Sequence, residues 1–279
     1  MKTKTVCFLI LLSLGAACST DNHPAQIRFP YKWLDEPGFG SDIDPKRRIK
    51  EPSGICFHPS RKTLFVVSDE GMLFEIRTDG MPVASIKIPG DLEGVTVDPH
   101  TGFLYVIVEC EDIILEFDPV DQEVTREFPI NRLWQGNPNY IQKQQDTFDH
   151  GVESLEFVPD EDHPEGGTFY AGNQWDPPCV FELYIPLKSS QEKTAEAKIL
   201  RVLPLKLDNP AAMYYDPETK LLNVVSDADN ILVEITLEGK IVKEYAFPGD
   251  NQEGITRDDQ GFMYIAQDSG GLLRVKDLR

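Results

Sequence analysis

The sequence predicts an all-β fold and, within that class, a single β-propeller. The stretch Leu92–Asp118 has the pattern of short apolar strands separated by turns, and similar stretches recur at a period of about 40 residues, which is typical of propeller blades. The repeats fill most of the 279 residues, which favours one domain over two. The last repeat has only three strands, so the N-terminal strand Ile27–Trp33 is expected to complete it and close the ring.

Five stretches begin with the same kind of apolar strand, so we expect a five-bladed ring. The blades are expected to begin near Pro52, Leu92, Gly151, Asn209 and Gln252. A six-bladed ring is the alternative, because Asn131–His150 contains tyrosine and isoleucine, although it alternates poorly. A loop of this length in a compact repeat is otherwise typical of a functional segment or a lid.

The first residues have the pattern of an export signal rather than of folded structure. Two lysines in Met1–Thr5 precede the apolar run Val6–Leu14, which is too short to span a bilayer stably. The small residues directly before Cys18 resemble the bacterial lipobox, although Gly15 stands where leucine is usual. Ordinary secretion without a lipid is the alternative.

The lipobox resemblance divides the chain into a lipoprotein signal peptide (1–18), a tether (19–26) and the propeller domain (27–279). It implies that Cys18 is acylated, and several acyl chains anchor a protein durably to a membrane. Ser19 implies sorting to the outer membrane, on either its periplasmic or its outer side. The expected location is therefore the cell envelope, with membrane contact through the lipid anchor only.

The charge balance excludes one class of partner. The chain has 47 acidic residues against 27 basic ones, for a net charge of −20. Nucleic acid is not an expected partner, because its phosphates require basic patches. The sequence also lacks a GxSxG elbow and a cysteine beside a suitable histidine. We therefore assign no catalytic residue and no organic cofactor.

Glutamates recur at one place in the repeats, directly before the small residue of the first strand. They are Glu93, Glu153 and Glu253, and the other two repeats have Ser53 and Ala211 there. First strands line the central channel of a propeller, so these side chains should form a ring at one mouth. Three glutamates so placed repel one another unless a cation or shared protons intervene, and their oxygens suit calcium or magnesium. Hydrogen bonds to neighbouring blades, or a hydrated channel, are the alternatives.

A second polar set follows the second strand of each repeat and is expected at the same end of the channel. It includes Asp69, Glu109 and Asn173. Local turn capping is the alternative interpretation of these residues. Aromatic side chains of the insertion Asn131–His150 would either cover that mouth or pack the insertion itself.

The order of these motifs resembles the SdiA-regulated family of bacterial exported or lipid-anchored proteins. The resemblance covers roughly residues 47–279 and rests on Leu92-Glu93-Gly94, Val152-Glu153-Ser154 and Gln252-Glu253-Gly254, with strand endings such as Val67-Ser68-Asp69-Glu70. It implies a five-bladed propeller, distantly similar to NHL-repeat propellers, with a bound calcium ion. The expected ligands of that ion are Glu93, Glu153, Glu253, Asp69, Glu109 and Asn173.

Two classes of function fit these expectations. In the first, the propeller is a calcium-binding module of the envelope that binds a small molecule or a protein at its face. In the second, it is a calcium-dependent hydrolase, such as a lactonase, phosphatase or phytase, that uses the same mouth. The mouth offers acids and few bases, which argues against a phosphate substrate. The sequence therefore favours the binding module.

Overall fold

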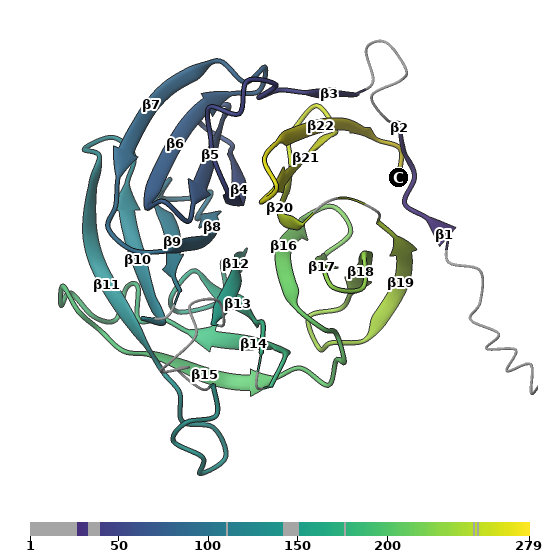
Figure 1. Cartoon of the computed structure of the whole chain (residues 1–279). Helices are drawn as coiled ribbons and strands as arrows, with labels where there is room; N and C mark the ends of the chain where they lie inside the picture. The colour runs from purple at the N-terminus through teal and green to yellow at the C-terminus, as the bar shows by residue number, and fades with distance from the viewer. Residues whose placement is uncertain are drawn as a thin grey trace, which may run out of the picture.

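Strands and tight turns make up the described part of the chain, and no helix occurs in it. The computed structural model describes residues 27–32, 40–109, 111–141, 151–175, 177–247, 249 and 251–279. Figure 1 shows the sheets arranged around a central axis, like the blades of a propeller. No helix that is long and apolar enough for a membrane span occurs among the described residues. The predicted all-β class is confirmed.

The strands repeat in the same order outward from the axis. The first strands are β4 (Pro52–His58), β8 (Leu92–Val97), β12 (Val152–Pro159), β16 (Pro210–Asp216) and β20 (Gln252–Arg257). The second strands are β5 (Thr63–Ser68), β9 (Leu104–Val108), β13 (Gly167–Asn173), β17 (Leu221–Ser226) and β21 (Phe262–Gln267). The third strands are β6 (Met72–Arg77), β10 (Ile113–Asp118), β14 (Cys179–Tyr184), β18 (Ile231–Ile235) and β22 (Leu272–Asp277). The fourth strands are β7 (Pro82–Lys87), β11 (Glu123–Asn131), β15 (Ala197–Val202) and β19 (Ile241–Ala246).

Consecutive strands of each repeat pair antiparallel, and the first strands contact one another in a cycle. β4 neighbours β8, β8 neighbours β12, β12 neighbours β16, β16 neighbours β20, and β20 returns to β4. Hydrophobic side chains fill the space between adjacent sheets, as Phe65 and Val106 do between the sheets that contain β5 and β9. Because both faces of the inner strands are covered, β5 (TLFVVS) is buried along its whole length, whereas β7 is mostly exposed.

Small residues in the first strands are explained by the close approach of the neighbouring first strand. A Cβ atom on Gly94 of β8 would lie 2.4 Å from the backbone nitrogen of Leu155 in β12. A Cβ atom on Gly54 of β4 would lie 2.2 Å from the carbonyl oxygen of Glu93 in β8. Neither distance leaves room for a methyl group, so glycine at these positions lets the strands close around the axis.

Replacing Gly94 by alanine should therefore destabilise the protein. The added methyl group has to push β12 away from β8, and overpacking of this kind costs about 1–3 kcal/mol. Thermal unfolding followed by circular dichroism measures the loss. Ser85→Ala on the exposed strand β7 is the control, and its free energy of unfolding should stay within about 0.5 kcal/mol of the wild type. A Gly94→Ala protein that melts together with the wild type would contradict the close approach of β8 and β12.

The N-terminal segment closes the ring, but not as the single strand that the sequence predicted. β1 (Ile27–Arg28) pairs in parallel with β19. β2 (Tyr31–Lys32) and β3 (Gly40–Asp42) both pair antiparallel with β22. Pro30 separates β1 from β2, and a proline has no amide hydrogen with which to continue a ladder. The segment therefore bridges two sheets, as the short strands along their outer edges show in Figure 1.

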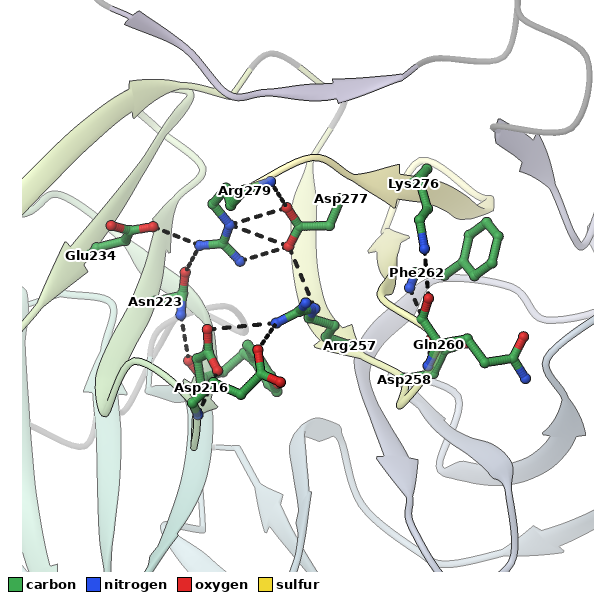
Figure 2. Close-up of polar contacts among 12 residues, drawn as sticks. Asp216, Asn223, Glu234, Arg257, Asp258, Gln260, Phe262, Lys276, Asp277 and Arg279 are labelled. Atoms are coloured by element: carbon green, nitrogen blue, oxygen red, sulfur yellow. Dashed lines mark hydrogen bonds and ion pairs between the residues drawn. The ribbon is translucent and has the colours of Figure 1, made fainter.

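Arg279, the last residue, also connects these two sheets, through side chains of β17 and β18 in one and of β22 in the other. Figure 2 shows the guanidinium of Arg279 between side chains of β17, β18 and β22. Its Nη1 atom donates to Asn223 at 2.6 Å and to Glu234 at 2.8 Å, and its Nη2 atom donates to Asp277 at 2.9 Å. The carboxylates of Glu234 and Asp277 are buried, so they depend on a positive partner to offset their lost hydration.

Candidate metal centre

Each first strand carries an irregularity at the same place. The pairing register between the first and second strands shifts within β4, β8, β12, β16 and β20. Such a β-bulge takes a residue out of the ladder and re-aims its side chain. The residues within the bulges include Ser53, Glu93, Glu153, Ala211 and Glu253. The positions that the sequence pattern makes equivalent are therefore equivalent in the structure.

Among the described residues, one group of carboxylates is close enough to share a cation. One carboxylate oxygen each from Asp69, Asp91 and Glu93 lies within 4.8 Å of the others. Asp69 follows β5, whereas Asp91 directly precedes β8 and Glu93 lies in the bulge of β8, so the group joins two adjacent sheets. The hydroxyl of Ser53 donates a hydrogen bond to Asp69 and helps to fix it.

Glu93 and Glu153 are buried among other acids. Burial raises the pKa of Glu93 well above its usual range, and the charges of Glu153 and Asp69 raise it further. Burial likewise raises the pKa of Glu153, as do the charge of Glu109 and a hydrogen bond with it. Two carboxyl groups joined in this way hold a proton between them. Without a cation, the surroundings of these side chains therefore favour their protonated forms.

Glu253 extends the acidic group to a further sheet. Burial raises its pKa to about 9, with additional effects from the charges of Asp268 and Asp69. Burial also raises the pKa of Asp69 to about 6; the hydrogen bond from Ser53 opposes this rise, and the charges of Asp91 and Asp268 add to it. Because each of these groups acts on another, they lie at one end of the channel, which we call the acidic mouth. Its members are Asp69, Asp91, Glu93, Glu109, Glu153 and Glu253.

Asn173 is placed differently from the acids with which the sequence pattern groups it. The backbone amide of Asp69 donates to the carbonyl oxygen of Glu51. The equivalent bond in the third repeat runs from Gln174 to Gly151, so Gln174 is the counterpart of Asp69. Asn173 lies one position earlier, and its Nδ2 atom donates to two carbonyl oxygens of the following loop. This contact is the turn capping that was the alternative interpretation.

Several buried side-chain oxygens at this end of the sheets have no hydrogen-bond donor in the described part of the chain. They include the Oδ1 atoms of Asn173, Asn209 and Asp268 and the Oε1 atom of Gln252. A buried acceptor without a partner is unfavourable, and a nearby cation removes the penalty. The described side chains of the acidic mouth are all carboxylates, which suits calcium or magnesium rather than zinc. The residues therefore fit a hard divalent cation.

Asp91 is a functional candidate that the sequence pattern did not identify. Three of the positions equivalent to Asp91 are occupied by Glu51, Asn209 and Asn251, with positive φ values of 43°, 41° and 53°. Polar residues are common turn formers, so an aspartate in this turn carries no separate signal. The signal that would have identified Asp91 is its place two residues before a bulged glutamate.

The long insertion after β11 is described as far as Ile141. Trp134 and Tyr140 pack against the hydrophobic cluster that also contains Ile141. Of the two interpretations of these aromatic residues, packing of the insertion is the one that the contacts favour. Residues 142–150, the remainder of the insertion, lie outside the described residues, as does the predicted lipidation site Cys18.

Comparison with known proteins identifies the fold. The glutaminyl cyclase of Myxococcus xanthus matches with a TM-score of 0.55 at 11% sequence identity, over 85% of this chain and 92% of that one. A Bacteroides caccae protein of unknown function matches with a TM-score of 0.49 at 14% identity, over 79% of this chain and 72% of that one. At 11% identity, the likeness to the glutaminyl cyclase concerns the fold alone. No curated protein matches the chain. The family model described as SdiA-regulated matches residues 34–270.

Proposed function

The chain belongs to the SdiA-regulated family of β-propellers, and we propose that it is a calcium-binding recognition module of the bacterial cell envelope. In this proposal the acidic mouth holds the ion, and the same face of the propeller binds a small molecule or a protein. The observation that carries the proposal is the convergence of Asp69, Asp91 and Glu93, whose carboxylate oxygens lie within 4.8 Å of one another.

Charge repulsion explains why this arrangement requires a cation. Two carboxylates at this spacing repel each other by about 3.5 kcal/mol in an effective dielectric constant near 20. Protonation relieves the repulsion, which adds to the larger effect of burial in raising the pKa values of Glu93, Glu153 and Glu253. A divalent cation relieves it more completely, because it turns each carboxylate into an attractive partner.

Calcium is the ion that the ligand set fits best. Calcium accepts about six to eight oxygen ligands in a flexible geometry, whereas magnesium requires a near-ideal octahedron and retains several waters. Carboxylates that come from bulges and loops of different sheets suit the flexible case. The bound ion would neutralise the acidic mouth, hold adjacent sheets together and offer an oxygen-bearing ligand a positive charge.

The cell-envelope location rests on the N-terminal sequence. The small residues before Cys18 and the serine after it support lipidation and sorting to an outer membrane. Residues 19–26 would then tether the propeller to the bilayer, with the acidic mouth free to meet its partner on whichever side of the membrane the anchor lies.

A five-bladed ring is part of the same proposal. It is supported by the cycle of contacts from β4 through β8, β12, β16 and β20 back to β4. The pairing of β11 with β15 supports it as well, because the fourth strands of consecutive repeats lie edge to edge there without a further blade between them.

Thermal unfolding tests the proposed ion. The purified protein should melt at a higher temperature with excess calcium than with excess EGTA, because a ligand of the native state at a hundred times its Kd stabilises by about 2.7 kcal/mol. For a chain of this size that corresponds to roughly 5–10 °C. Magnesium at the same concentration should give a smaller shift.

Two substitutions distinguish the acidic mouth from general surface charge. Glu93→Gln removes a proposed ligand and should abolish the calcium-dependent shift. Glu123→Gln removes the same charge from an exposed position on β11 and should retain the shift. A melting temperature that does not respond to calcium, in protein shown by metal analysis to have been stripped, would refute the proposed site.

A further inference from the structure

A cavity lies at the end of the central channel opposite the acidic mouth. Its volume is about 510 Å³, within the range of roughly 300–1,000 Å³ that is usual for small-molecule sites. It forms where the first strands end, and each of them contributes the residue at one equivalent position. We call it the far pocket, and these residues are Cys56, Thr96, Glu156, Tyr214 and Thr256.

The walls of the far pocket are largely apolar and aromatic. Phe57, Phe157, Tyr214 and Tyr215 are among the residues that line it. Aromatic faces carry partial negative charge and attract cations as well as apolar groups. The pocket therefore offers a surface for an apolar body that also tolerates a positive charge.

Glu156, on β12, is a carboxyl group that the first strands on either side of β12 hold in place within this cavity. Its Oε1 atom accepts a hydrogen bond from the backbone amide of Tyr215 at 2.8 Å, and its Oε2 atom accepts one from the hydroxyl of Thr96 at 3.0 Å. Each carboxylate oxygen can accept more than one hydrogen bond. The group is therefore preorganised, and it retains capacity for a donor from a ligand.

A hydrogen bond that links one first strand to the next does not require a carboxylate. The hydroxyl of Thr96 accepts a hydrogen bond from the backbone amide of Phe157 at 3.1 Å. The hydroxyl of Thr256 accepts one from the backbone amide of Phe57 at 3.1 Å. A threonine performs in these two repeats the bridging that Glu156 performs in a third. Since burying a carboxyl is costly, its presence at this position needs another reason.

The charges around the far pocket disfavour an anionic occupant. Arg257 is the one basic residue among the described residues that line it. Its guanidinium lies 3.7 Å from Asp216, 3.5 Å from Glu218 and 3.8 Å from Asp277, so three carboxylates already share it. Figure 2 shows Arg257 held in this network at the end of β20.

We propose that the far pocket binds a small organic ammonium ion with an apolar body. The ammonium N–H groups donate to the carboxylate of Glu156, and the body lies against the aromatic walls. This site is independent of calcium, because it lies at the other end of the channel from the acidic mouth.

Proton release should accompany binding. Burial raises the pKa of Glu156 to about 8, although hydrogen bonds from the Tyr215 amide and the Thr96 hydroxyl lower it. The free protein therefore holds Glu156 mostly protonated at pH 7, and a bound ammonium ion, with a pKa near 10, would drive it to ionise. Burial raises the pKa values of two neighbouring groups, the thiol of Cys56 and the phenol of Tyr214. The remaining ionisable side chains around the pocket are Tyr215, Asp216, Glu218, Arg257, Asp258 and Asp259.

The test compares three probes of one shape. 2-Phenylethylamine is a cation, 2-phenylethanol is neutral and phenylacetate is an anion. Protein-observed NMR should show that the amine perturbs the Tyr215 amide more strongly than the alcohol does, and that phenylacetate leaves it unchanged. The affinity for the amine should rise about tenfold per pH unit from pH 6 to pH 7, because the ionised fraction of Glu156 rises by that factor. Calcium and EGTA should leave it unchanged.

Glu156→Gln is the decisive variant, since it retains the shape and the acceptor for the Tyr215 amide. It should weaken amine binding by about thirtyfold or more and abolish the pH dependence. Glu123→Gln, which removes an exposed charge on β11, should leave both unchanged. The proposal is overturned if the alcohol binds as tightly as the amine, or if amines at millimolar concentration leave the Tyr215 amide unperturbed. If Glu156→Gln does not fold, the pH dependence of the wild type decides the question.

Discussion

Raising the pH from about 5 to 9 should lower the melting temperature of the metal-free protein, and excess calcium should remove the part of that decline that comes from the acidic mouth, leaving the smaller contribution of Glu156. The reason lies in the carboxyls of the acidic mouth. The pKa of Glu253 is raised to about 9 and that of Asp69 to about 6. In the unfolded chain the same groups titrate near pH 4. Between these values the folded state binds more protons than the unfolded state, so its stability falls as protons are removed.

The size of this effect follows from the number of groups involved. Each carboxyl that is protonated in the folded state and ionised in the unfolded state lowers the free energy of unfolding by up to about 1.4 kcal/mol per pH unit. Glu93 and Glu153 contribute in the same direction as Glu253, because their pKa values are also raised. We therefore expect a decline of several kcal/mol, ending as the pH passes the folded pKa values.

Below about pH 4 the trend should reverse, so that the stability of the folded protein falls as the pH is lowered further. Hydrogen bonds from Ser189, Lys188 and Tyr184 outweigh burial and lower the pKa of Glu165 to about 2. A carboxyl with a lowered pKa contributes stability that is present above its unfolded pKa and is lost as the pH falls toward its folded value. The metal-free protein should therefore be most stable in mildly acidic solution.

Melting curves across this pH range, with EGTA and with calcium, test the expectation. Glu253→Gln should flatten the metal-free profile between about pH 5 and 9, because glutamine removes one of the titrating groups. Glu123→Gln, on exposed β11, should preserve its slope. A metal-free melting temperature that rises steadily from about pH 5 to 9 would show that ionisation of the carboxyls in the acidic mouth does not destabilise the folded protein.

The position of the bulged glutamates was predictable because two constraints act on neighbouring residues. Glu93 is followed by Gly94, and Glu253 is followed by Gly254, in strands that must approach their neighbours closely. The small residue is dictated by the ring, so it marks the register of every repeat even where the strand composition varies. Aligning on it brings the acids together without any knowledge of the bulge.

The rest of the site could not be predicted in this way. Asp91 lies in a turn, where polar residues are expected for local reasons. Asn173 is displaced by one position from Asp69, and only the backbone bond of Gln174 reveals the correct counterpart. The far pocket gave no signal in the sequence, because its equivalent positions hold different residue types that share no pattern. Chemistry at such positions becomes visible once the strands are arranged around one axis.

Replacing Phe29 by alanine should destabilise the protein by about 3–5 kcal/mol, as expected for truncation of a buried aromatic side chain. Phe29 is 2% exposed and lies between β1, which pairs with β19, and β2, which pairs with β22. Its ring makes edge contacts with Tyr245 at 5.3 Å and Phe247 at 5.4 Å between centroids. The guanidinium of Arg279 lies over its face at 4.8 Å.

These contacts make Phe29 the point at which both ends of the chain meet the two sheets that close the ring. The sequence pattern could not single it out, because strands of two residues have no measurable alternation. Its loss should open the junction between β19 and β22 locally as well as lower the global stability. Hydrogen exchange should therefore accelerate first at the amide of Leu278, which donates to the carbonyl oxygen of Pro30 at 2.9 Å.

Ile27→Ala provides the matched control for Phe29→Ala. Ile27 lies two residues before Phe29, on β1, but is 68% exposed, so its truncation should change the free energy of unfolding by no more than about 0.5 kcal/mol. Equal melting temperatures for the two variants would mean that the N-terminal segment rests on the propeller without closing it. A large loss of stability in Phe29→Ala alone, with early hydrogen exchange at the Leu278 amide, would instead show that this side chain and the strands on either side of it hold the ring closed.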